Sequence, residues 1–452
     1  MFRDETLKQI FLLAWPVMIT QILNLLYNLF DAFWLGNLEG ATTVAAIQIS
    51  WPVFGMLIAV GYGFSTAAVS LVSQYNGADM KENVNLVSSQ IILITFLISL
   101  PLAIIGYLAT PTLVYSLGVE SLVAEEAIKY IKIIFLGFPF IFITISADGI
   151  FRGNRQMVLS MVVIGISVLL NILLDPFFIE GYYFFPKLGI SGAAIATIIA
   201  YAFSSFLFLI FLFLGRRGIK ISIRYMVPNL KKITKILKIG IPASIGYGGS
   251  SLGFFFLMYI IAMVPNATTA LAAYGIGDRL MYMILIISLG IAAASSTLVG
   301  EALGENSIEK AKKVVRKALT TAFIITTLFV IVTAIFRTEL IGLFLHNEDV
   351  ILEGSLYIII FSIGMPFFAI FNIVDGVFAG SGHNIPTMIC EIMRLMLLRI
   401  PLSYILGISL GLGSKGIWIS MTISNIIAAL LGLALLSSDI WKNRVIDVPT
   451  AT

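Results

Sequence analysis

The sequence has few of the charged residues that cover a soluble protein. Only 12% of its 452 residues are charged, against roughly 25% in an ordinary soluble domain, and 59% are apolar. A water-exposed fold of this size needs far more polar surface, whereas a lipid-exposed fold has apolar side chains on its inside and its outside. The low charge therefore excludes a water-soluble globular protein and predicts an integral membrane protein.

Thiol and imidazole groups are also scarce. The only cysteine is Cys390 and the only histidines are His346 and His383, which excludes a disulfide framework, a cysteine metal site and a histidine cluster. A membrane-embedded transferase would need a catalytic constellation, and neither histidine has a plausible intramembrane acid partner by spacing. No G-x-x-x-x-G-K-[ST] loop occurs either. We therefore expect no enzyme activity, no cofactor and no bound nucleotide.

Long apolar runs are abundant, and each is a candidate transmembrane helix. A helix needs roughly 20 apolar residues to cross the hydrocarbon core of a bilayer. Runs of this kind predict an all-α membrane protein with twelve spans, at residues 11–36, 44–74, 86–108, 127–147, 157–180, 190–214, 237–263, 270–299, 318–336, 356–377, 386–410 and 416–438.

Basic residues are distributed unequally between the loops. With a cytoplasmic N-terminus, the inner segments hold twenty lysines and arginines and the outer loops hold three. An excess of lysine and arginine marks the cytoplasmic side of a membrane protein. The sequence therefore predicts that both termini are cytoplasmic, and this asymmetry explains the net charge of +4 without a nucleic-acid partner.

The chain repeats itself at an offset of 227 residues. Residues 137–153 align with residues 364–380 at that offset, and eight of the seventeen positions are identical. Six helices in each half give both copies the same membrane orientation, related by a pseudo-two-fold axis along the membrane normal, which is a common plan of transporters. We expect the following division: an N-terminal six-helix lobe at 1–214, a basic cytoplasmic linker at 215–236, a C-terminal six-helix lobe at 237–438 and a cytoplasmic tail at 439–452.

The first helix carries a polar stripe that ends in an acid. The acid is Asp31, and it is preceded at seven, four and three residues by Asn24, Tyr27 and Asn28. Residues at these spacings share one face of a helix. An ionisable residue inside the membrane is expensive and is a functional candidate by default. Pro16 precedes this stripe in the same helix. A bend there that is coupled to the charge of Asp31 would make it a conformational hinge; the alternative, and the more frequent role of such a proline, is a static kink.

The fifth helix repeats the pattern. Ser167, Asn171 and Asp175 follow one another at intervals of four residues between apolar neighbours. If this stripe faces the one on the first helix, the two carboxyl groups could share a proton or coordinate Na⁺ through oxygen ligands. The sequence leaves the ion open between H⁺ and Na⁺. The alternative is that Asp175, which precedes a proline, only bonds backbone groups near the membrane edge.

Other ionisable residues lie within or beside the predicted helices. Asp148 ends the fourth helix of the same lobe and is a second-tier member of the cation-coupling site. The eleventh helix carries Glu391, Arg394 and Arg399, and the spacing of the first two predicts mutual neutralisation. We interpret these three as structural, although the sequence does not decide their role.

Three motifs in the N-terminal half carry a resemblance to a known family. They are the first-helix runs Trp15-Pro16-Val17 and Leu26 to Gly36, the second-helix run Ser65 to Ala78, and Phe151-Arg152-Gly153-Asn154 leading into the fifth-helix stripe. With these motifs the chain resembles the multidrug and toxic compound extrusion (MATE) transporters, and within them the DinF-like branch of bacteria and archaea. The likeness covers essentially the whole chain and implies a multi-pass protein of a prokaryotic plasma membrane.

The resemblance also implies roles for particular residues. In the DinF-like branch the first-helix acid, the fifth-helix acid and the asparagine four residues before it form a cation site with a sixth-helix threonine nearby. These roles fall on Asp31, Asp175, Asn171 and Thr197, and the family's first-helix tyrosine matches Tyr27. The chain departs from the family in the first-helix stripe, where the family often has glutamine and this chain has the shorter amide Asn24.

These observations together predict a secondary antiporter. It would export organic, often cationic, amphiphilic compounds in exchange for H⁺ or Na⁺, with Na⁺ held, if that is the ion, by Asp31, Asn171 and Asp175. The alternative is a flippase for a lipid-linked saccharide or another lipid, which would need a large basic central cavity. Arg394 and Arg399 are the residues that favour that alternative.

Overall fold

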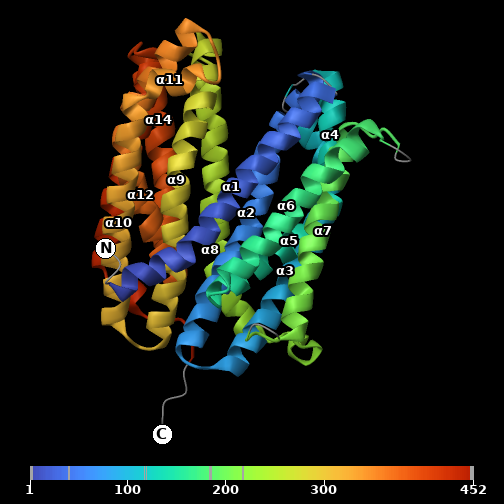
Figure 1. Cartoon of the computed structure of the whole chain (residues 1–452), viewed down its shortest axis with the longest axis vertical. Coiled ribbons are helices and arrows are strands. Elements are labelled where there is room, and N and C mark those ends of the chain that lie inside the picture. The colour runs from blue at the N-terminus through green and yellow to red at the C-terminus, as the bar shows by residue number, and fades with distance from the viewer. Residues whose placement is uncertain are drawn as a thin grey trace. The chain divides into compact units, whose positions relative to one another are not determined.

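The described part of the chain is helical. The computed structural model describes residues 4–38, 41–116, 118, 120–182, 186–215 and 218–447, and at some positions of the first two helices, Asp31 among them, it describes the backbone alone. These residues form helices and no strand (Figure 1). The helices are α1(Glu5–Leu38), α2(Ala41–Gly77), α3(Lys81–Ser116), α4(Ser121–Leu136), α5(Phe138–Gly153), α6(Met157–Glu180), α7(Ile190–Leu214), η1(Ile223–Met226), α8(Leu230–Ile261), α9(Ala267–Gly304), α10(Ile308–Ile335), α11(Arg337–Gly342), α12(Glu348–Ser381), α13(Ile385–Ile392), η2(Met393–Arg399), α14(Ile400–Ser403), η3(Tyr404–Ser409), α15(Gly413–Ser437) and η4(Ile440–Lys442).

The helices confirm the predicted all-α membrane fold. Ten helices of the described residues are long and apolar enough to cross a membrane, and α4 with α5 forms an eleventh span bent by 57°. The predicted eleventh helix is a continuous run of α and π turns from α13 to η3. The span expected at 127–147 is bent, because Gly137 separates α4 from α5 and Pro139 has no backbone N–H to continue the hydrogen-bond ladder.

The described chain divides into two compact units. One consists of residues 19–244, and the other of residues 1–18 together with 245–452. The chain therefore passes from one unit to the other within α1 and within α8. Each passage comes two residues after a helix-interior proline, Pro16 or Pro242, and these prolines are equivalent in the repeat. The two units follow from packing, whereas the predicted lobes follow from helix order. The two divisions therefore assign the first halves of α1 and α8 to different parts of the protein.

The repeated sequence motif is a helix-packing contact that occurs once in each unit. A methyl group added at Gly149 of α5 would lie 2.5 Å from the backbone oxygen of Ser65 in α2. A methyl group added at the equivalent Gly376 of α12 would lie 2.6 Å from the backbone oxygen of Ala292 in α9. Positions 65 and 292 are themselves 227 residues apart. Small residues permit this close approach of helix backbones, so the two units repeat the same contact.

The first halves of α1 and α8 also pack in equivalent ways, each on its own unit. A methyl group at Gly63 of α2 would lie 2.4 Å from the backbone oxygen of Gly240 in α8. A methyl group at Gly290 of α9 would lie 3.0 Å from the backbone oxygen of Ala14 in α1. The repeat therefore includes the first halves of α1 and α8, each of which packs on the unit that does not contain the rest of its helix.

Candidate functional site

A polar pocket lies within the unit of residues 19–244. Its lining comes from four helices, α1, α5, α6 and α7, and its empty volume, including the open side, is about 370 Å³. The lining residues are Asn24, Tyr27, Thr144, Ile164, Ser167, Val168, Asn171, Thr197, Ala200, Tyr201 and Ser204. Four predicted site residues, Asn24, Tyr27, Asn171 and Thr197, thus lie around one pocket. The lining offers hydroxyl and amide groups and no basic side chain, which suits a small cation.

Helix α6 contributes the acid and the amide of the site. Asp175 is 0% exposed and Asn171 is 1% exposed. The amide nitrogen of Asn171 donates a hydrogen bond of 3.3 Å to Oδ1 of Asp175, one turn further along α6. Asn171 Oδ1 is buried and accepts no hydrogen bond from the described protein atoms. A buried oxygen without a donor is costly, so this atom is available to a ligand that enters the pocket.

Helices α1 and α7 close the site opposite α6. The hydroxyl oxygens of Tyr27 and Thr197 are 2.9 Å apart and form a hydrogen bond. Asn24 lines the same pocket one turn earlier on α1, and its amide donates a hydrogen bond of 3.4 Å to Gln21. Asn24 and Tyr27 of the α1 stripe and Ser167 and Asn171 of the α6 stripe therefore line a common space.

Hydroxyl groups fix the walls of the pocket: Ser167 belongs to the predicted fifth-helix stripe, whereas Thr144 and Ser204 were not singled out by the sequence analysis. Ser167 of α6 donates a hydrogen bond of 2.6 Å to the backbone oxygen of Ala200 in α7. Thr144 of α5 lies 3.0 Å from the hydroxyl of Ser204 in α7. Isolated hydroxyl residues are common in transmembrane helices and bond backbone or neighbouring helices, so no sequence signal distinguishes Thr144 and Ser204.

Two other acids of the predicted site, Asp31 and Asp148, are not among the residues that line the pocket as the structure describes it. The backbone of Asp31 lies in α1, but its side chain is outside the described residues. Asp148 of α5 is not in the pocket lining. Its carboxylate forms an ion pair of 2.9 Å with Arg152 and accepts a hydrogen bond from Ser160. Arg152 also donates to Ser65 of α2 at 2.8 Å, which ties Asp148 to the packing of α2, α5 and α6.

A charged cluster occupies the other unit. Arg394 forms a bidentate pair with Glu391, with nitrogen–oxygen distances of 2.7 and 2.9 Å. Arg399 donates to Asn425 at 2.6 Å and to Ser424 at 3.0 Å, and Ser424 is the repeat equivalent of Thr197. The two arginines are 2% and 1% exposed. They are bonded within the helix bundle, which does not favour the flippase alternative.

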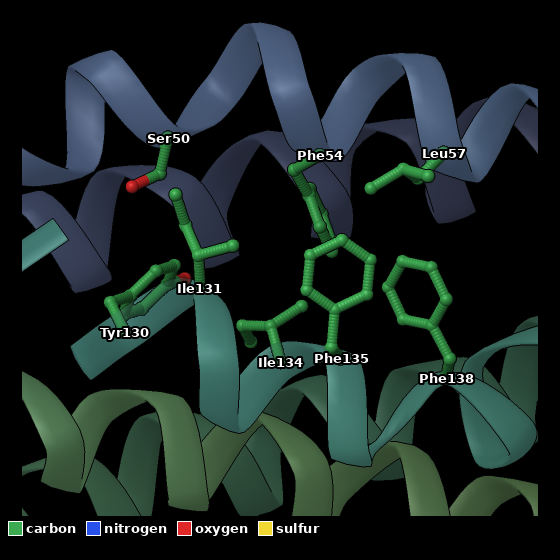
Figure 2. Close-up of a pocket in the computed structure, with 8 residues that line it drawn as sticks. All are labelled: Ser50, Phe54, Leu57, Tyr130, Ile131, Ile134, Phe135 and Phe138. Carbon is green, nitrogen blue, oxygen red and sulfur yellow. The ribbon is translucent and has the colours of Figure 1, made fainter. Parts of the chain in front are cut away.

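A second pocket has no comparable chemistry. It lies between α2 and the α4–α5 pair and is lined by apolar and aromatic side chains (Figure 2). Ser50 and Tyr130 contribute its two hydroxyl groups, and the Ser50 hydroxyl already donates to the backbone oxygen of Ala46 at 2.7 Å. We therefore assign the candidate ion site to the polar pocket.

Comparison with known proteins identifies the family of this chain. The MatE family model matches residues 16–177 and 242–405, one segment in each half of the repeat. The chain belongs to the MatE family. A family member from Bacillus subtilis (strain 168), the probable multidrug resistance protein YoeA, is 24% identical over 95% of this chain and 93% of its own length. The probable multidrug resistance protein NorM of Mannheimia succiniciproducens is 26% identical over 94% and 92%.

Solved structures of the family have the same fold. A crystal structure of a MATE protein in complex with MaL6 matches with a TM-score of 0.90, 26% identity and 97% coverage of both chains. The MatE chain described here is therefore a multi-pass membrane transporter and not an enzyme, and its relatives are multidrug efflux proteins. These comparisons do not decide between the branches of the family.

Proposed function

We propose that the protein is a cation-coupled multidrug exporter whose coupling ion binds in the polar pocket of the N-terminal half. The observation that carries this proposal is the buried Asn171 Oδ1, which accepts no hydrogen bond from the described residues. Asn171 lines the pocket one turn before the buried Asp175. An oxygen-lined pocket beside a carboxylate provides what a bare cation needs when it leaves water. Asp31 joins the site on the sequence evidence alone.

The proposed cycle follows from the cost of a buried charge. A desolvated carboxylate is unfavourable unless it is paired, so binding H⁺ or Na⁺ at Asp175 removes that cost. The bound ion favours a different packing of α1 and α6, with α1 bending at Pro16. This change releases the exported compound outside the cell, and loss of the ion to the cytoplasm resets the protein. Substrates are small amphiphilic, often cationic compounds, and no nucleotide or nucleic acid takes part.

The pocket supports both candidate ions in different ways. Asn171, Thr197 and Tyr27 supply neutral oxygens, which suit Na⁺. Asp175 supplies a buried carboxyl, which suits a proton. Asp148 is a weaker member of the site, because its carboxylate is already paired with Arg152.

The test is ion-driven efflux of ethidium from proteoliposomes under an imposed pH or sodium gradient. We expect one gradient to drive efflux by the wild type, and Asp175→Asn and Asn171→Ala to reduce it at least tenfold while inserting normally. Asn372→Ala is the matched control, because it removes an amide that bonds Ser288 at 3.0 Å in the other unit; we expect it to retain efflux. The proposal fails if neither gradient drives efflux, or if both pocket variants work like the wild type.

A further inference from the structure

The segment between α7 and α8 is folded against α3. Gln90 of α3 is 0% exposed and makes three hydrogen bonds to the backbone of this segment. Its amide nitrogen donates to the backbone oxygens of Tyr225 and Val227 at 2.5 and 2.8 Å, and its amide oxygen accepts from the backbone nitrogen of Asn229 at 2.9 Å. The segment is therefore a fixed part of the unit.

Two more side chains of α3 continue this attachment. Asn85 Oδ1 accepts a hydrogen bond of 2.8 Å from the backbone nitrogen of Lys220. The Ser89 hydroxyl accepts one of 3.3 Å from the backbone nitrogen of Ser222. Polar residues in the first three turns of α3 thus position the segment from residue 220 to residue 229.

These attachments set the depth of the segment in the membrane. Residues 81–90 of α3 are mostly polar, and an apolar run begins directly after Gln90. On the other side, Ile221 donates its backbone N–H to the oxygen of Leu212, in the last turn of the apolar helix α7. Both contacts place residues 221–227 at the boundary between the hydrocarbon core and the lipid headgroups.

The segment presents apolar and basic side chains together. Ile223, Val227 and Leu230 are 78%, 70% and 77% exposed, so the protein leaves most of their apolar surface uncovered. Lys220, Arg224 and Lys231 are exposed among them. We call these six residues the linker face. Basic residues beside exposed apolar ones at a membrane interface are typical of segments that bind anionic lipids.

We propose that the linker face binds the headgroups of anionic phospholipids and inserts its three apolar side chains at the acyl boundary. The attachment to α3 means that the backbone of this surface is ordered before the lipid binds, so binding has no backbone ordering cost to overcome. Its charge and its depth together favour lipid over a soluble protein partner. The anchor would hold the cytoplasmic end of α3 and α7 at a fixed height, and it does not depend on the identity of the transported compound.

The first experiment measures lipid retention by native mass spectrometry during titration with phosphatidylglycerol or phosphatidylcholine. We expect the wild type to retain phosphatidylglycerol preferentially, with retention falling at high salt. The variant Lys220→Gln/Arg224→Gln/Lys231→Gln should weaken this binding on the order of a hundredfold, because each basic residue near an anionic surface contributes about fivefold.

A matched control separates the linker face from net charge. The variant Lys310→Gln/Lys312→Gln/Arg316→Gln removes the same charge from the start of α10, where Lys310 and Lys312 already pair with glutamates, and we expect it to retain phosphatidylglycerol. A second variant, Ile223→Asn/Val227→Asn/Leu230→Asn, should keep the headgroup preference and bind more weakly. Equal retention by the wild type and both linker-face variants would overturn the proposal, as would a dimer held together by this face.

Discussion

Adding one methyl group at Gly376 or Gly380 tests the close packing of α12 on α9. The new carbon at Gly376 would lie 2.6 Å from the backbone oxygen of Ala292, and at Gly380 2.1 Å from that of Ser296. Ordinary contacts between such atoms are near 3.5 Å, so the helices must separate by about 1 Å. Overpacking of this kind costs typically 1–3 kcal/mol, and alanine returns about 1 kcal/mol in helix propensity. We expect a net loss of up to about 2 kcal/mol at Gly376 and a larger one at Gly380.

The assay is thermal unfolding of the purified protein in detergent, followed by fluorescence and by size exclusion. Gly275→Ala is the matched control, because it lies in α9 with no atom within 4 Å of the added carbon, and we expect it to be neutral or more stable by up to about 1 kcal/mol. The packing argument is refuted if Gly376→Ala and Gly380→Ala unfold at the same temperature as the control.

Three other substitutions have expected outcomes. Glu391→Gln leaves the buried Arg394 without its charge partner and should lower the unfolding free energy by about 3–5 kcal/mol, which Arg394→Met in the same chain should partly restore in a thermal melt. The Lys317 ammonium, 2.9 Å from Asp4, lowers the pKa of that carboxyl to about 2. Because the ionised carboxyl is the stabilising form, Asp4→Asn should lower Tm at pH 7, and the difference should close as the pH falls from about 4 toward 2; a difference independent of pH contradicts this. Tyr27→Phe removes a hydrogen bond to α7 and should cost about 1 kcal/mol and weaken the apparent affinity for the coupling ion in efflux assays.

The sequence was sufficient to predict the helices and the repeat. Long apolar runs determine the spans, because backbone groups in lipid must be satisfied within a helix. It could not show why the repeated motif has its particular residues. The glycines at 149 and 376 are explained only by the backbone oxygens of Ser65 and Ala292, which lie far away in sequence. The sequence also could not show that the first halves of α1 and α8 pack on the other unit, because helix order assigns each helix as a whole to one lobe.

The candidate site was predictable to a similar extent. Helical periodicity shows which residues share a face, so the pairing of Asn171 with Asp175 and the stripe through Tyr27 were expected. Periodicity does not show which faces meet, and it therefore missed Thr144 and Ser204. The ion pair of Asp148 with Arg152, four residues apart on α5, follows from the same periodicity. Periodicity could not show that Asp148 lies outside the pocket lining, because that depends on how α5 is rotated.

The most direct test of ion coupling measures the ion itself. Uptake of radioactive sodium, or of protons with a pH-sensitive dye, is followed in proteoliposomes while an exported cation such as ethidium is added or withheld. Ethidium should stimulate uptake of one ion by the wild type and not by Asp175→Asn or Asn171→Ala. Ethidium transport without movement of either ion, or equal ion uptake by the wild type and both variants, would contradict coupling at this pocket.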